Sequence, residues 1–243
     1  MKHIDRQILQ IALPSIVSNI TVPLLGLIDV AIVGHLGSPA YIGAIAVGGM
    51  LFNIIYWIFG FLRMGTSGMT SQAYGKRDLP EIVRLLMRSV GIGLAVALCL
   101  ILLQVPIRQT AFLIIHPTAE VREMATLYFH ICIWGAPAML GLYGLSGWFI
   151  GMQNSRIPMY IAITQNIVNI IASLSFVCFF KMKVEGVAFG TLIAQYAGFI
   201  MGLVLWMSRY GKLKKYILWK GVLQKEAMMR FFQVNRDIFL RTL

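Results

Sequence analysis

One acidic residue, Asp29, falls inside a long apolar run, "LLGLIDVAIVGHLG" (24–37). The other acids fall in loops or near the ends of the chain: Asp5, Asp78, Glu81, Glu120, Glu123, Glu185, Glu226 and Asp237. A charged aspartate in the middle of a membrane helix costs about 2.5–3.5 kcal/mol, so its presence usually marks an ion or proton pathway. The alternative is that Asp29 lies in water at the outer interface, because Gly34 soon follows it.

Polar side chains precede Asp29 on the same predicted helix. Ser15, Ser18 and Asp29 share one helical face, and Asn19 lies at the edge of that face. Two prolines in this run free backbone carbonyl groups along the way. The spacing therefore predicts a polar stripe that leads to Asp29.

Two later apolar runs also carry polar side chains at helical spacing. In "TQNIVNIIASLS", Asn166, Asn169 and Ser173 stand at i, i+3 and i+7, and in the next run Thr191 and Gln195 stand at i and i+4. One interpretation is that they join helices through hydrogen bonds worth about 1 kcal/mol each. The other interpretation is that they face the same pocket as Asp29.

The second interpretation predicts a proton or cation coupling site at Asp29, Asn169, Ser173 and Thr191. Carboxylate, carboxamide and hydroxyl oxygens suit a proton or a hard cation such as sodium. Weak sodium binding would use Asp29, Asn169 and Thr191, and we expect no catalytic residue, resident metal or organic cofactor. The remaining polar residues are expected to line a substrate cavity: Ser18, Asn19, Asn166 and Gln195.

The composition is that of an integral membrane protein. Of the 243 residues, 58% are hydrophobic and 12% are charged, whereas soluble domains carry about 25% charged residues. Because a bilayer core needs roughly 20 apolar residues per helix, the sequence predicts an all-α fold with six transmembrane helices. The six runs are 8–33, 42–64, 83–105, 126–152, 158–180 and 187–208.

The net charge of +12 arises from basic residues placed between and after these runs. With a cytoplasmic N-terminus, most of them fall inside, and the outer loops hold only Arg108, Arg122, Lys181 and Lys183. We therefore expect the N-terminus and the basic tail in the cytoplasm and no nucleic-acid partner. The stretch 209–230 is either an amphipathic segment on anionic lipid or a solvated linker.

Three other residues have simpler interpretations. His130 is expected as a hydrogen-bonded interior residue, with a proton relay as the alternative, and Arg63 ends the second run, where it would snorkel or pair. The "GTSG" stretch (65–68) matches the G-x-S-G of intramembrane serine proteases. That chemistry would need a histidine base, and His130 is the only intramembrane one that could reach Ser67.

These stretches resemble the MATE (multidrug and toxic compound extrusion) family, in particular its DinF-like branch. The resemblance extends from the first run to the sixth and is carried by "IALPSIVSNITVPLLGLIDVAIVGHLG", "SGMTSQAYGKRD", "IWGAPAMLGLYGLSGWFIGMQNSRIPMY", "TQNIVNI" and "VEGVAFGTLIAQ". It implies one lobe of a two-lobe antiporter, in which the first-helix aspartate, a fifth-helix asparagine and a sixth-helix threonine fall on Asp29, Asn169 and Thr191. Some relatives carry a second aspartate where this chain has Ser173, which disfavours sodium.

The resemblance implies a multipass protein of the cytoplasmic (inner) membrane, not an enzyme, that exchanges protons or sodium for drugs or other organic compounds. Its expected parts are a six-helix lobe (1–208), a basic cytoplasmic linker (209–230) and the start of a second lobe and seventh helix (231–243). Small organic substrates, membrane lipids and a missing carboxy-terminal lobe are the expected partners. Two alternatives stay open, namely a lipid-linked oligosaccharide flippase of the same superfamily and an intramembrane serine protease.

Overall fold

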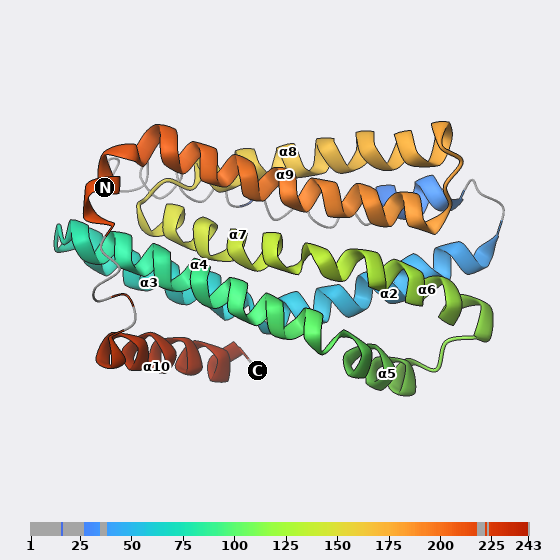
Figure 1. Ribbon diagram of the computed structural model, residues 1–243, viewed down its shortest axis with the longest axis horizontal. Coiled ribbons are helices and arrows are strands. Elements are labelled where there is room, and N and C mark those ends of the chain that lie inside the picture. The colour runs from blue at the N-terminus through green and yellow to red at the C-terminus, as the bar shows by residue number, and fades with distance from the viewer. Residues whose placement is uncertain (1–15, 17–26, 35–37, 218–221, 223, 243) are drawn as a thin grey trace.

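The computed structural model describes residues 16, 27–34, 38–217, 222 and 224–242. Within this part of the chain the regular structure is helical, without strands, and the helices run mostly along one long axis (Figure 1). This confirms the predicted all-α fold. After the helical stretch 27–34, the elements are α2 Pro39–Ile58, α3 Gly60–Gly75, α4 Leu79–Leu102, α5 Gln104–Ile115, α6 Ala119–Cys132, the 3₁₀ helix η1 Ile133–Gly135, α7 Ala136–Gly151, α8 Arg156–Leu174, the π-helical turn η2 Ser175–Phe179, α9 Val184–Tyr210, the 3₁₀ helix η3 Gly211–Tyr216 and α10 Lys225–Thr242.

Five helical segments of the described chain are long and apolar enough to cross a membrane. They correspond to the second to sixth predicted runs, which confirms a membrane bundle for that part of the chain. Most of the first run, 8–33, lies outside the described residues, and only its end is seen as helix. The five segments are Pro39–Gly75, Leu79–Leu102, Ala119–Gly151, Arg156–Phe179 and Val184–Tyr216.

The second span continues through α3 to Gly75, well beyond the end predicted at residue 64. Hydropathy falls in α3 because it is rich in glycine, serine and threonine. One face of α3 is nevertheless buried: Gly65 is buried, and Thr66 and Thr70 have no exposed surface, whereas Gly68 and Ser71 are exposed. Small side chains are buried here by close approach of helix backbones, a signal that hydropathy does not carry.

Glycines let α7 lie directly on α3 and α4. A Cβ added to Gly151 would lie 2.8 Å from the carbonyl oxygen of Ser67 on α3, and one on Gly144 would lie 3.0 Å from the backbone nitrogen of Val90 on α4. A Cβ on Gly93 of α4 would likewise lie 2.7 Å from the α7 backbone. These three helices therefore pack backbone against backbone, as small residues permit in membranes.

The fourth span is interrupted by a short turn. The 3₁₀ turn η1 separates α6 from α7, and Pro137 stands in the first turn of α7. Proline is tolerated there because the first turn of a helix has free N–H groups in any case. A short helix, α5, occupies a segment predicted as a connection, and its many apolar side chains are largely exposed.

Two clusters of buried side chains hold the bundle together. The first contains Phe52 of α2 and Phe129 of α6, whose rings stack with centroids 5.1 Å apart, and it takes in Val33 from the stretch 27–34. The second centres on Trp148 of α7, whose indole N–H donates to the Ile82 carbonyl at 2.9 Å. The first cluster thus fixes the helical turn that carries Asp29.

The tail is helical over part of the segment predicted as a linker, since η3 spans Gly211–Tyr216 and α10 begins at Lys225. α10 packs on α3, with Phe231 in the second cluster and Asn235 against Gly65. A buried arginine of α4, Arg88, also holds this region. Its Nε donates to the Val222 carbonyl at 2.8 Å, and its guanidinium lies 2.6 Å from a carboxylate oxygen of Glu81.

We expect Arg88→Met to lower the free energy of unfolding by about 3 kcal/mol, because it removes one partner of a buried ion pair. The loss is at the lower end of the range for such pairs, since the Glu81 side chain is 30% exposed and can be rehydrated. Arg84→Met is the matched control, because Arg84 lies 3.7 Å from the same carboxylate with a side chain that is 29% exposed, and its more distant pair should contribute less than about 1 kcal/mol. Unfolding of the detergent-solubilised variants measures both, and equal losses would contradict the prediction.

Candidate functional site

Asp29 is buried, with 5% of its surface exposed. Its Oδ1 atom has no hydrogen-bond partner among the described residues. An interface residue would be expected to have its carboxyl group in bulk water. The carboxyl group of Asp29 is instead buried in this structure. A buried carboxyl oxygen without a partner is costly, and such atoms tend to occur where a ligand or proton binds.

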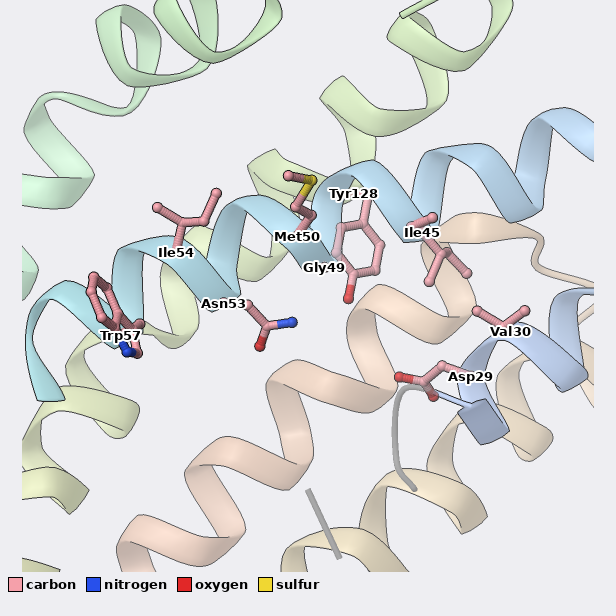
Figure 2. Close-up of a pocket in the computed structure, with 10 residues that line it drawn as sticks. Asp29, Val30, Ile45, Gly49, Met50, Asn53, Ile54, Trp57 and Tyr128 are labelled. Carbon is pink, nitrogen blue, oxygen red and sulfur yellow. The ribbon is translucent and has the colours of Figure 1, made fainter. Parts of the chain in front are cut away.

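The Asp29 side chain lines a cavity of about 550 Å³, which we call cavity A. Most of its wall comes from α2, whose Gly49 leaves the space open and whose Asn53 and Trp57 point into it (Figure 2). Tyr128 of α6 completes the polar part of the wall, on the same side as Asp29 (Figure 2). Cavity A is thus a mainly apolar hollow with a carboxyl group, a carboxamide and a phenol in its wall.

Asn169 and Thr191, for which the sequence left open a helix-joining role and a role in a shared pocket, meet between α8 and α9. The Asn169 side-chain N–H donates to the Thr191 hydroxyl at 3.0 Å, and Asn169 has no exposed surface. Ser173, one turn further along α8, is also fully buried, and its hydroxyl lies against Gly190 of α9. The Asn169 carbonyl oxygen and the Ser173 hydroxyl have no hydrogen-bond partner among the described residues, so this pocket holds unused oxygen atoms.

Tyr128 links the two halves of the predicted site. It is 5% exposed and lies in electrostatic contact with the Asp29 carboxyl on one side and the Thr191 hydroxyl on the other. Within the described chain, no hydrogen bond joins Asp29 directly to Asn169 or Thr191. Tyr128 is not among the site residues predicted from the sequence. Its position two residues before His130, inside an apolar span, is the only signal that the sequence gives.

The remaining predicted residues divide into two groups. Gln195 lies against Gly135 at the kink between α6 and α7, and its side-chain carbonyl oxygen is buried without a partner in the described part of the chain. Asn166 is half-buried on α8. Ser18 and Asn19 lie outside the described residues. Among the residues that the structure describes, no three histidine, cysteine or acidic side chains are placed to hold a metal ion.

His130 is held by α5, and it does not pair with Ser67. Arg108 donates to Nε2 of His130, and the Nδ1–H of His130 donates to the Gln104 side-chain oxygen at 3.1 Å. Both ring nitrogens are therefore used, which agrees with the interior hydrogen-bonding interpretation. Ser67 lies on α3, in the opposite half of the bundle from α6 (Figure 1). Among the described residues, His130 therefore cannot serve Ser67 as the base that the protease alternative needs.

A second hollow of about 520 Å³, cavity B, lies among α3, α7 and α8. Arg63 lines it, together with Ser67, Tyr143, Ser146 and Gln165. The second run does not end at Arg63 as expected, because α3 runs on for twelve residues to Gly75. At 1.5 Å per residue, about 18 Å of helix separates Arg63 from that end.

Comparison with known proteins places this arrangement in a family of transporters. A family model described as MatE matches residues 14–175. The chain is 37% identical to DNA damage-inducible protein F of Escherichia coli (strain K12), and the match covers 98% of this chain and 52% of that protein. It is 20% identical to multidrug export protein MepA of Staphylococcus aureus (strain MW2), over 98% of this chain and 52% of that protein.

Solved structures share the same fold. A crystal structure of MATE in the bent conformation matches with a TM-score of 0.86 at 19% identity, over 97% of this chain and 52% of that one. The eukaryotic MATE transporter AtDTX14 matches with a TM-score of 0.82 at 19% identity, over 98% and 54%. The chain spans about half the length of the curated relatives it matches. Since the MatE model covers well over half of the chain, this protein belongs to the MATE family.

Proposed function

We propose that this chain forms the amino-terminal lobe of an antiporter that exports organic compounds across the cytoplasmic membrane in exchange for protons. The observation that carries the proposal is the burial of Asp29 on the wall of cavity A, with an oxygen atom that no described residue satisfies. Such intramembrane acids mark proton and ion pathways. Sodium is the second candidate for the coupling ion, at Asp29, Asn169 and Thr191.

The surroundings of Asp29 support a proton in preference to sodium. Ca²⁺ and Na⁺ sites gather several oxygen ligands around one point, whereas Asp29 makes no direct bond to Asn169 or Thr191 among the described residues. The phenol of Tyr128 lies between them. A phenol can donate to a charged carboxylate and accept from a neutral carboxyl group. Tyr128 therefore suits a group that changes between these two states.

The proposed cycle couples the charge of Asp29 to the shape of cavity A. Protonation from the outer side removes the charge, so the carboxyl group can be buried more deeply at lower cost. The stretch 27–34 then packs more closely against the first cluster, through Val30 and Val33. Cavity A narrows and releases its occupant outward. Alternating access further requires a second lobe, as in other transporters built from repeats.

The occupant is proposed to be an apolar organic compound, and this chain is proposed to face the cytoplasm at both of its ends. Cavity A has Trp57, Met50 and Ile54 in its wall, side chains that accept varied apolar shapes. The basic segment 209–217 is proposed to lie on anionic lipid. A flippase for lipid-linked oligosaccharides stays the runner-up, and cavity A opposes it because the only charged residue among its described lining residues is an acid.

The full-length protein in proteoliposomes tests this function. With an inside-acid pH gradient, we expect the protein to move a lipophilic fluorescent cation in the direction opposite to the proton flow. This should hold for protein inserted in either orientation. The rate of cation movement should be several-fold higher than in protein-free liposomes. An equal sodium gradient at constant pH should give little movement. The 243-residue chain alone should not transport, because alternating access needs both lobes. Movement that ignores the pH gradient, or that the 243-residue chain performs equally well, would refute the proposal.

A further inference from the structure

Cavity B contains a positive charge that no acidic side chain of the described residues neutralises. Arg63 is half-buried on α3 and lines the cavity. Within the described chain, its guanidinium forms no hydrogen bond and no ion pair. Arg63 stands inside the candidate membrane span Pro39–Gly75, twelve residues before its end. Intramembrane arginines normally pair with an acid or a carbonyl group, or line a path for a ligand.

The rest of the cavity wall offers hydrogen bonds but no negative charge. Ser67 of α3, Tyr143 and Ser146 of α7 and Gln165 of α8 contribute three hydroxyl groups and a carboxamide. No aspartate or glutamate stands among the described lining residues. Tyr143 is in electrostatic contact with Arg63, so the phenol and the guanidinium act on the same region of the cavity. A volume of about 520 Å³ is enough for a small organic molecule.

We propose that cavity B binds the anionic group of an organic substrate, a carboxylate in the first instance, through Arg63. Arginine is suited to this because its planar guanidinium can donate two parallel hydrogen bonds to a carboxylate. The proposal rests on the proposed export function, for which it names a class of substrate. It also gives the lobe two cavities of opposite character, since Asp29 makes cavity A acidic and Arg63 makes cavity B basic.

Equilibrium binding to the full-length protein in nanodiscs tests the proposal with two probes that share one fluorophore. Dansylglycine carries a carboxylate, and dansylglycinamide replaces it with a neutral amide. We expect the native protein to bind dansylglycine at least about tenfold more tightly than the amide, which is about 1.4 kcal/mol. Arg63→Gln should remove this preference and leave affinity for the amide within about twofold, while Arg63→Lys should keep part of the preference.

Two further variants make the result specific to cavity B. Arg156→Gln removes an exposed arginine at the start of α8, outside the described cavity lining, and should leave the preference unchanged. Gln165→Glu places a carboxylate in the same cavity and should abolish the preference without touching Arg63. It also keeps the test valid if Arg63→Gln fails to fold. Equal binding of both probes by the native protein would overturn the proposal, and so would a preference that survives both Arg63→Gln and Gln165→Glu.

In this design, the proposed anion site and the proposed export function can be contradicted independently of one another. Probe binding needs no gradient and no second substrate, so a preference for dansylglycine that depends on Arg63 would stand even if no proton-driven export were found. Conversely, export of a lipophilic cation driven by protons, with equal binding of the two probes, would support the antiporter and reject the anion site.

Discussion

Replacing Asp29 with asparagine is expected to reduce proton-driven export by the full-length protein about 100-fold. Asparagine has nearly the same size as aspartate, so the wall of cavity A should keep its shape. The variant cannot gain or lose a proton, and the link between proton binding and the packing of the stretch 27–34 is therefore removed. The expected loss is near the upper end of the coupling energies that join two sites in one protein.

Transport in proteoliposomes at several outer pH values measures this effect. In the native protein the export rate should rise as the pH falls on the side that corresponds to the cell exterior, because protonation of Asp29 from that side drives release of the substrate. In Asp29→Asn the rate should be low at every pH and the dependence flat. Asp237→Asn is the control, since this carboxylate of α10 is exposed and pairs only with the adjacent Arg236 among the described contacts. Unchanged export by Asp29→Asn, with the native pH dependence, would reject the coupling role.

Replacing Gly190 with valine is expected to lower the free energy of unfolding by about 3 kcal/mol. A Cβ at this position would lie 2.8 Å from the backbone nitrogen of Ser173, which cannot move without shifting α8. Overpacking of a tight contact costs about 1–3 kcal/mol, and the two further methyl groups of valine add to the overlap. Separating α8 from α9 would also break the hydrogen bond between Asn169 and Thr191.

Denaturation of the protein in mixed detergent micelles measures the loss. The control is Gly91→Val on α4, where an added Cβ would meet no heavy atom within 4 Å and the residue is exposed. Because valine replaces glycine in a helix in both variants, their difference isolates the contact with Ser173. Equal stabilities of the two variants would show that α8 and α9 are not as closely packed as described.

Sequence patterns were sufficient to predict most of the helices and part of the site. Apolar runs located the five described spans. Helical spacing placed the polar residues of each run on one face, because i, i+3 and i+4 positions share a face whatever the neighbours are. These features depend on local chemistry, which a single sequence contains. That Asn169 of one run bonds to Thr191 of the next is seen only in the structure.

Features that depend on contacts between distant segments could not be predicted. The second span was expected to end near Arg63 because hydropathy falls there, whereas α3 continues and its Thr66 and Thr70 pack against Gly147 and Gly151 of α7. Tyr128 lies beside Asp29 only because α6 packs on α2, a pairing that no local pattern specifies. The same pairing of distant helices, among α3, α7 and α8, creates the cavity around Arg63.

The glycine contacts of α7 restrict how this lobe can move. Side chains can change rotamer to let one helix slide along another, but a backbone that rests on a backbone has no such freedom. The α3–α4–α7 unit should therefore tilt or shift only as one solid block. Any local rearrangement must then come from helices outside the block, and the stretch that carries Asp29 is one of them.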